Sequence, residues 1–395
     1  MIRKQFFDVP ADFSLSETQM NDEYCHSHFP SYSNSTSLIL CHWYDQLSTL
    51  TVYVQDYEYL ISAISLIINI FHLIVLSHKS MRTSCINIIL LAISVVDILY
   101  DINPVGYKFQ DVMRKCDLPN SYIVEVFNVL TSDLRIFSLR CSIYLSLSIA
   151  VIRAIVVKNP LNPRIDKLST PSFGVFTIIS VGIFCGVLTA PEFYRTVIMK
   201  YDYWMPDPMN LPCIENYHGK NFTPVVYLVA LSPTFLDNES QLESLYLTIE
   251  AIVFYIFPSI ILPIVTIILV LEMRAADKKR ASLTSGSDNK GNRTTKMVTY
   301  MTILFCIIQL PRVVVNFTIF FLTDYGFGIA RSFLSTVLNG IFGFYTITEF
   351  IICLSISTQY QATLRNLFGK KRKVIKCESQ SKKSTISIRS VSAHI

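Results

Sequence analysis

The chain has 395 residues and a formal net charge of +5, with 51% hydrophobic and only 16% charged residues. Soluble domains carry about 25% charged residues, so this composition excludes an ordinary soluble domain. The sequence also lacks a phosphate-binding glycine loop, an HExxH sequence and a metal-spaced Cys/His cluster. We therefore expect no enzyme activity, no cofactor, no metal site and no nucleic-acid partner.

Seven apolar blocks are long enough to cross a bilayer, which takes about 20 helical residues. In chain order they cover residues 59–77, 84–102, 130–157, 173–194, 245–271, 296–322 and 333–357. They do not alternate apolar and polar residues as barrel strands would, and only helices or closed barrels satisfy backbone hydrogen bonds in lipid. The sequence therefore predicts an all-α membrane protein with a seven-transmembrane helix bundle.

The charge distribution predicts the orientation. Segments 78–84, 153–168, 272–296 and 358–395 fall on one side of the membrane and hold 22 of the 34 lysines and arginines. Positive loops stay cytoplasmic, so the C-terminus is predicted inside and the N-terminus outside, at the plasma membrane. The predicted organisation is an extracellular segment at 1–56, a transmembrane domain at 57–357, an amphipathic helix at 358–369 and a disordered cytoplasmic tail at 370–395.

Glycosylation sequons and cysteines agree with this orientation. Sequons at Asn34, Asn221 and Asn238 lie on the predicted outer side, where glycans are added. Four cysteines are predicted extracellular, and four cysteines allow three pairings; they are Cys25, Cys41, Cys116 and Cys213. We favour a disulfide between Cys116 and Cys213, which would leave Cys25 to pair with Cys41.

Polar residues inside the predicted spans point to a receptor. A charged residue at a helix centre costs roughly 2.5–3.5 kcal/mol and is usually functional. Asn69, Asp97 and Arg153 occur as IINIFHLIVL, LLAISVVD and AVIRAIVVKNP, and the sixth span reads FCIIQLP with Phe305 six residues before Pro311. These contexts resemble rhodopsin-like G-protein-coupled receptors over about residues 57 to 370.

A narrower resemblance is carried by three longer stretches. They are HLIVLSHKSMRTSCINIILLAIS, SLRCSIYLSLSIAVIRAIVVKNPLNP and IICLSISTQYQATLRNLFG. They look like the nematode serpentine receptors of class W, a group that resembles FMRFamide-type neuropeptide receptors. This resemblance implies a chemosensory or neuropeptide receptor that signals through a heterotrimeric G protein, without naming a ligand.

The chain departs from the rhodopsin-like pattern at three positions. Ile152 replaces the acid that usually precedes Arg153, Gln309 replaces the usual tryptophan before the kink proline, and the Asn-Pro-x-x-Tyr stretch begins at Glu349 and ends at Cys353. The resemblance implies that Arg153 lies at the G-protein end of the bundle. The departures put in doubt whether switching follows the family's usual contacts and allow a raised basal activity.

Ligand contacts are expected from polar residues near the outer ends of the spans. These candidates are Asp101, Asp133, Arg135, Glu250, Gln309 and Arg312. Arg135 and Ser142 are seven residues apart, so they share one helix face. Each candidate has a second interpretation, in which it pairs with a neighbouring helix to offset its burial.

A second polar group is expected deeper in the bundle. Asn69, Asp97, Ser142 and Glu349 form a predicted hydrated cluster. It would either hold Na⁺ or form an ion-free interhelical hydrogen-bond network, and we favour the network because Glu349 replaces a neutral side chain.

The functional interpretation is a receptor activated by an extracellular ligand, with a peptide favoured over a small molecule. Expected partners are that ligand, a G protein, the lipid bilayer, and an arrestin and a kinase at the serine-rich tail. The alternatives are a small-molecule chemoreceptor, a non-coupling decoy or scaffold with a receptor fold, and a transporter or channel. The last is disfavoured because the sequence has no internal repeat.

Overall fold

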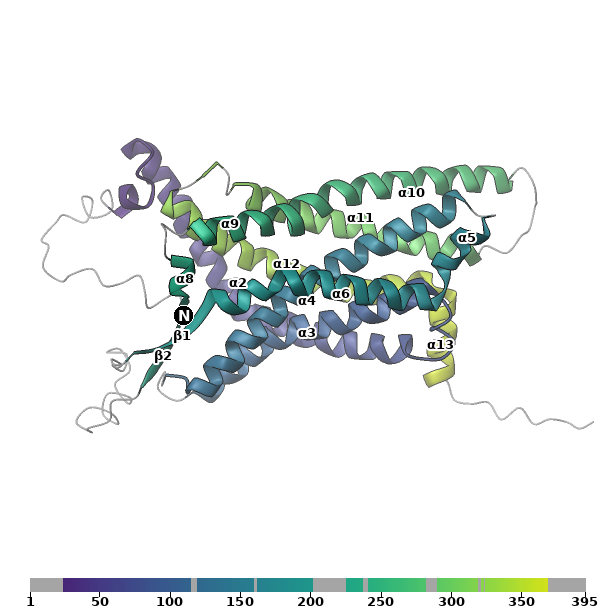
Figure 1. Ribbon diagram of the computed structural model, residues 1–395, viewed down its shortest axis with the longest axis horizontal. Helices are drawn as coiled ribbons and strands as arrows, with labels where there is room; N and C mark the ends of the chain where they lie inside the picture. The colour runs from purple at the N-terminus through teal and green to yellow at the C-terminus, as the bar shows by residue number, and fades with distance from the viewer. Residues whose placement is uncertain are drawn as a thin grey trace, which may run out of the picture.

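The computed structural model describes residues 24–114, 119–159, 162–201, 225–236, 241–281, 290–318, 321–322 and 324–368. Within these residues, seven helical segments are long and apolar enough to cross a membrane. They are α2 (Asn34–Leu76), α3 (Cys85–Met113), α4 (Tyr122–Lys158), α6 (Pro171–Arg195), the continuous α9 (Gln241–Glu250), η4 (Ala251–Ile256) and α10 (Phe257–Ala281), α11 (Lys290–Phe317) and α12 (Tyr325–Ile356). The predicted seven-helix membrane bundle is confirmed (Figure 1).

Short elements connect the long helices. The hairpin of β1 (Thr196–Tyr201) and β2 (Val226–Leu231) and the short helix α8 (Pro233–Leu236) lie between α6 and α9, and α5 (Pro163–Asp166) and η2 (Lys167–Ser169) join α4 to α6. The hairpin is antiparallel, with Thr196 opposite Leu231 and Tyr201 opposite Val226. It lies at one end of the bundle, and α13 (Thr358–Phe368) runs across the other end (Figure 1).

Helices α2, α3, α4, α10, α11 and α12 form a closed ring of contacts, and α6 packs against α3 and α4. Helix α2 contacts α3 and α12, α3 contacts α4, α4 contacts α6 and α10, and α11 bridges α10 and α12. An aromatic group of Tyr100, Phe305, Phe342 and Tyr345 fills the middle of this ring. Because α4 touches so many neighbours, its side chains can connect several helices at once.

Helix α2 carries its polar side chains inward and its apolar side chains outward. Ser62, Ser65 and Asn69 are buried, whereas Ile64 and Ile67 are exposed. This arrangement is expected when the surrounding solvent is lipid and the helix interface is built from small and polar residues. The helix has 43 residues and is therefore about 65 Å long, so it begins well before the apolar block predicted at 59–77.

The N-terminal segment is fastened to the start of α12. A disulfide joins Cys25 and Cys41, whose Cα atoms are 5.5 Å apart. This is the pairing left to these two cysteines by the sequence analysis. The Ser31 backbone N–H and hydroxyl both donate to the Asp324 carboxylate, at 3.1 and 2.6 Å, and the Phe29 ring lies 5.0 Å from that of Phe327. Cys116 and Cys213, the favoured pair, lie outside the described residues.

Helix α13 is held against α2 by a buried contact. The Tyr360 hydroxyl lies 2.9 Å from His72 Nδ1, and Ser80 and Thr363 share a hydrogen bond of 2.8 Å. Burial raises the pKa of Tyr360, so the phenol stays protonated and shares one hydrogen with the imidazole nitrogen. Helix α13 and α2 are thereby connected at the end of the bundle opposite the hairpin.

Candidate functional site

Three buried or largely buried arginines lie between the middle of the bundle and its hairpin end. Arg135 and Arg140 are on α4 and Arg312 is on α11. Tyr122, at the start of α4, contacts Tyr227 of β2, which places that end of α4 beside the hairpin. Cationic side chains are costly in a membrane protein's interior, so the partners of each arginine define the chemistry of this region.

Arg135 connects α4 to α2, α3 and α12. Its guanidinium pairs with Glu58 of α2 and donates to the Tyr100 hydroxyl at 3.0 Å, while its Cζ lies 4.5 Å from the Tyr100 ring centroid. The Tyr100 hydroxyl in turn donates to the Asn339 carbonyl oxygen at 3.0 Å. A change at Arg135 would therefore affect four helices.

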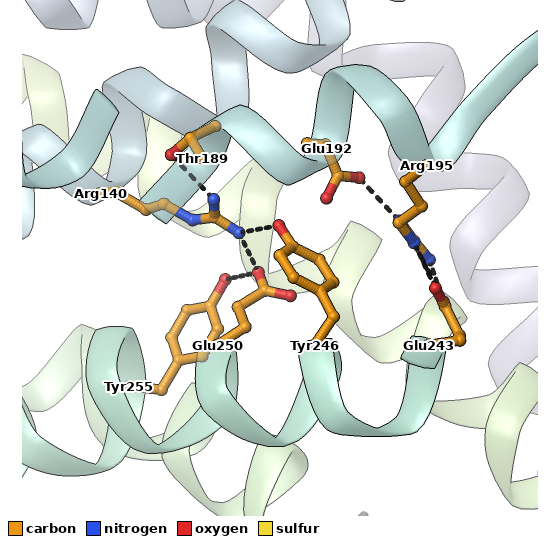
Figure 2. A network of polar contacts seen from close by, with 8 residues as sticks. All are labelled: Arg140, Thr189, Glu192, Arg195, Glu243, Tyr246, Glu250 and Tyr255. Atoms are coloured by element: carbon orange, nitrogen blue, oxygen red, sulfur yellow. Dashed lines mark hydrogen bonds and ion pairs between the residues drawn. The ribbon is translucent and has the colours of Figure 1, made fainter. Parts of the chain in front are cut away.

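Arg140 connects α4 to α6 and α9 on another side of the same helix. Figure 2 shows its guanidinium donating to Thr189 at 2.8 Å, Tyr246 at 3.2 Å and Glu250 at 2.7 Å. The Phe254 ring covers it, with the Arg140 Cζ 4.5 Å from the ring centroid. Arg140 is only 1% exposed, whereas the Glu250 side chain is 17% exposed, so the cation of this pair is the more deeply buried partner.

A second ion-pair group continues the same row. Arg195, at the end of α6, donates to Glu192 at 2.7 Å and to both oxygens of Glu243 at 2.6 and 2.9 Å (Figure 2). Asp133 of α4 is buried nearby and interacts electrostatically with Glu192. The contact between α4, α6 and α9 therefore includes a row of buried ion pairs beside its apolar side chains.

The chain leaves ordinary α-helix directly after Glu250. Residues Ala251–Ile256 form a π-helix, and α10 resumes at Phe257. This π-helix carries Phe254 against Arg140 and Tyr255, whose hydroxyl lies 3.5 Å from Glu250. Single π-turns are frequent at functional sites, and this one positions the partners of a buried charge.

Arg312 faces α12 and keeps one buried hydrogen-bond donor without an acceptor. Its Nη1 donates to Asn339 Oδ1 at 3.0 Å, while its Nη2 is buried without a hydrogen-bond partner. The same is true of Gln309 Nε2 and of both carboxylate oxygens of Asp101. Asp101 lies beside Ser62 and Ser65 of α2.

Five of the six expected ligand residues thus separate into two neighbourhoods, and Gln309 lies apart from both. Arg135, Arg312 and Asp101 face α2, α3 and α12, whereas Asp133 and Glu250 belong to the ionic row with α6 and α9. Gln309 borders a cavity of about 20 Å³ between α4, η4, α10 and α11.

The expected polar core of Asn69, Asp97, Ser142 and Glu349 lies further from the hairpin end of the bundle than these residues. The Ser142 hydroxyl points at Asp97 from 3.5 Å, and the Tyr345 hydroxyl donates to Glu349 at 2.9 Å. Asn69 donates to Ser65, which shares a 2.6 Å hydrogen bond with Thr346. One set of these contacts joins α2 to α12 and another joins α4 to α3. Among the described residues, no group of three or more His, Cys, Asp and Glu residues could hold a metal ion.

The expected switch residues occupy two levels of the bundle. Phe305 is buried and its ring lies 5.3 Å from that of Tyr345, and Pro311 is within α11. Arg153 is partly buried near the other end of α4, and it has no ion pair within the part of the chain described. The neighbouring Ile152 is buried and supplies no charge.

Sequence reasoning missed most partners of the arginines. The missed residues are Glu58, Tyr100, Thr189, Glu192, Arg195, Glu243, Tyr246 and Asn339. Glu58 lies just before the predicted span 59–77, and the others lie near or within predicted span ends. The sequence did contain a signal for these partners. A charged residue near the end of one span is a candidate ion-pair partner for an unpaired charge in another span.

The predicted glycosylation sites are only partly visible. Asn34 is exposed and is the first residue of α2, whereas Asn221 and Asn238 lie outside the described residues.

Comparison with known sequences identifies the family. No curated protein matches the chain. Residues 56–371, most of the chain, match the serpentine-type seven-transmembrane GPCR chemoreceptor family Srw, the group indicated by the sequence resemblance. The matched range includes the three arginines, their partners and the polar core. The chain therefore belongs to the Srw family of seven-transmembrane GPCR-type chemoreceptors and is a multi-pass membrane protein.

Proposed function

We propose that this receptor binds an extracellular ligand at the hairpin end of the bundle and signals through a heterotrimeric G protein at the α13 end. The excess of lysine and arginine in the loops on the α13 side supports this orientation. The exposed sequon at Asn34, on the opposite side, is consistent with it.

The observation that carries the ligand assignment is the set of buried polar atoms left without partners. Arg312 Nη2 and Gln309 Nε2 belong to this set, as do the Asp101 oxygens, whose polar neighbours include the Ser62 and Ser65 hydroxyl groups. Buried polar atoms in native proteins nearly always have hydrogen-bond partners. A ligand offering both acceptors and donors would complete these bonds, and a peptide backbone, including an amidated C-terminus of the FMRFamide type, offers both.

A small-molecule ligand is the second candidate. The family description is that of a chemoreceptor, and the cavity beside Gln309 measures only about 20 Å³. A space of this size holds little more than one water. A compact odorant would require less rearrangement of the bundle than a peptide.

Activation follows from two alternative packings of the helices, of which the ligand stabilises one. Contacts at Arg312 and Gln309 act on α11 on either side of Pro311, where the helix lacks a backbone hydrogen bond and can bend. Movement of the α11 end nearest α13 would open a cleft beside Arg153. We infer that Arg153, free of an ion pair within the described residues, contacts the G protein there.

The test is a G-protein dissociation assay in cells that express the tagged chain at the surface. The ligands are a library of C-terminally amidated peptides and a library of small volatile compounds. A saturable response to one ligand identifies its class, and Arg153→Ala should abolish the response at equal surface expression. Arg164→Ala is the matched control, because Arg164 is an exposed arginine on the same predicted face and should leave the response intact.

Two results would contradict the proposal. A response that survives Arg153→Ala would overturn the role of that residue. Silence of the surface-expressed chain towards both libraries, together with a basal signal equal to that of untransfected cells, would favour the decoy or scaffold interpretation. An ion current or solute uptake under the same conditions would instead favour a channel or transporter.

A further inference from the structure

Three carboxyl groups are buried in the middle of the bundle without a cation to pair with. Asp97 and Asp101 of α3 and Glu349 of α12 are each no more than 1% exposed. Among the described residues none of the three takes part in an ion pair. Asp97 and Glu349 interact electrostatically with each other across the two helices.

Hydrogen bonds satisfy only part of this group. Asp97 faces the Ser142 hydroxyl at 3.5 Å, and Glu349 accepts from the Tyr345 hydroxyl at 2.9 Å. The second oxygen of each carboxyl group, Asp97 Oδ2 and Glu349 Oε2, is buried without a partner. Asn69 Oδ1, on a fully buried side chain of α2, is a further acceptor without a donor. The group therefore has too many acceptors and too few hydrogens.

The surrounding helices supply no compensating charge to the Asp97–Glu349 pair. Among the described residues, α4 contributes the neutral side chains Ser142 and Ser146. Helix α11 contributes Thr302 and Phe305, and α12 contributes the titratable but neutral Tyr345 and Cys353. Arg135 acts on Asp101 rather than on the pair, and Arg135 is already matched by Glu58.

Two adjacent ionised carboxylates in this position would be very costly. Burying one unpaired carboxylate is strongly unfavourable, and a second like charge nearby disfavours ionisation further. Either a cation or a proton must therefore accompany the pair. The cavity beside Glu349 has a volume of about 10 Å³ and is lined mostly by apolar side chains such as Leu90, Ile93 and Leu262. It has room for at most one water, which favours the proton because a proton needs no cavity.

We propose that Asp97 and Glu349 form a proton-binding pair that holds at least one proton in the resting packing of the bundle. Loss of the proton places like charges on α3 and α12. The Tyr345 hydroxyl connects Glu349 to the Tyr345 ring, and this ring packs against Phe305 of α11. The pair thereby couples proton release to the position of α11. The effect of this coupling on signalling rests on the proposed function. Proton binding and the movement of α11 are independent of the proposed function.

Infrared spectroscopy of the purified chain in lipid nanodiscs tests proton binding directly. A protonated carboxyl group has a C=O stretch that a carboxylate lacks and that shifts in D₂O. We expect such a band at neutral pH, and we expect Asp97→Asn and Glu349→Gln each to change it. Asp56→Asn is the matched control, because Asp56 is an exposed acid on α2 and should leave the band unchanged.

The proposal is overturned if neither substitution changes a protonated-carboxyl band. It is also overturned if the thermal stability of the wild type increases with Na⁺ but not with K⁺, and Asp97→Asn removes this dependence. The second result would assign the site to a sodium ion. Each variant removes one carboxyl group of the pair, so a changed band in either variant that remains folded is sufficient, and misfolding of one variant leaves the other to decide.

The coupling is tested without a G protein by a fluorophore attached to a cysteine at the exposed Lys296 near the start of α11. Its emission should change with pH in Lys296→Cys and not after Glu349→Gln is added, with the labelled wild-type chain as background. One coupled proton changes the ratio of the two packings by at most tenfold per pH unit. A pH-independent emission would overturn the proposed coupling between proton release and the position of α11. If the emission depends on pH but the chain never activates a G protein, the coupling stands and only the proposed function is refuted.

Discussion

Replacing Glu250 by leucine should strongly destabilise the bundle, because it leaves Arg140 charged in a buried place. The two side chains are joined at 2.7 Å, and the exposed fractions are 1% for Arg140 and 17% for Glu250. The remaining partners of the guanidinium, Thr189 and Tyr246, are neutral. Neither can balance the charge.

The magnitude follows from the asymmetry of buried ion pairs. Removing one partner of such a pair costs about 3–5 kcal/mol, whereas replacing both by apolar residues of similar size is often close to neutral. Partial exposure of Glu250 places Glu250→Leu near the lower end, at about 3 kcal/mol. The double variant Arg140→Met with Glu250→Leu should recover most of this loss.

The measurement is reversible unfolding in mixed micelles of mild and denaturing detergent, carried out on the wild type, both single variants and the double variant. Asp111→Asn serves as the control, since its ion pair with Lys108 has side chains that are 50% and 33% exposed. Exposed pairs contribute at most about 1 kcal/mol. The reasoning is refuted if Glu250→Leu costs no more than Asp111→Asn, or if the double variant is as unstable as Glu250→Leu.

Three further changes probe contacts at the two ends of the bundle. Gly326→Ala would place a Cβ 2.5 Å from the Phe29 ring and 2.8 Å from the His28 carbonyl oxygen and should lower the free energy of unfolding by about 1–3 kcal/mol; Gly328→Ala, whose Cβ would lie 3.8 Å from the Arg331 side chain, is the matched control and should cost less. Cys41→Ser opens a disulfide with a sequence separation of 16 and should cost about 3 kcal/mol, a loss that reducing agent should reproduce in the wild type. Tyr360→Phe leaves His72 Nδ1 buried without its 2.9 Å contact; we expect a cost of about 1–3 kcal/mol and faster proteolysis after α13, and an unchanged digestion pattern would contradict this.

The number and approximate place of the transmembrane helices followed from the sequence because lipid imposes a long apolar block on every crossing. The helix ends did not follow, since hydropathy reports the solvent rather than the backbone. Helix α2 continues back to Asn34 through a stretch that contains Asp45, Asp56 and Glu58. Those polar residues lowered the apolar signal, although the buried face of the helix continues through Cys41, Thr51 and Glu58.

The charged residues of the candidate site were recognisable because ions inside a membrane span are rare. Their partners were not, because pairing depends on the rotation and relative height of helices far apart in sequence. Arg135 and Glu58 are 77 residues apart, and Arg140 and Glu250 are 110 apart. The π-helix that follows Glu250 adds to the difficulty, since it rotates the preceding turns relative to Pro258 in a way that 3.6-residue periodicity does not describe.

The two arginines of α4 indicate how a ligand contact could spread through the bundle. Arg135 and Arg140 are five residues apart, so their side chains diverge by about 140° around the helix. One therefore binds Glu58 and Tyr100, while the other binds Glu250. Helix α4 is consequently anchored by a charge on each of two sides, and it cannot rotate towards one set of partners without weakening its contacts with the other.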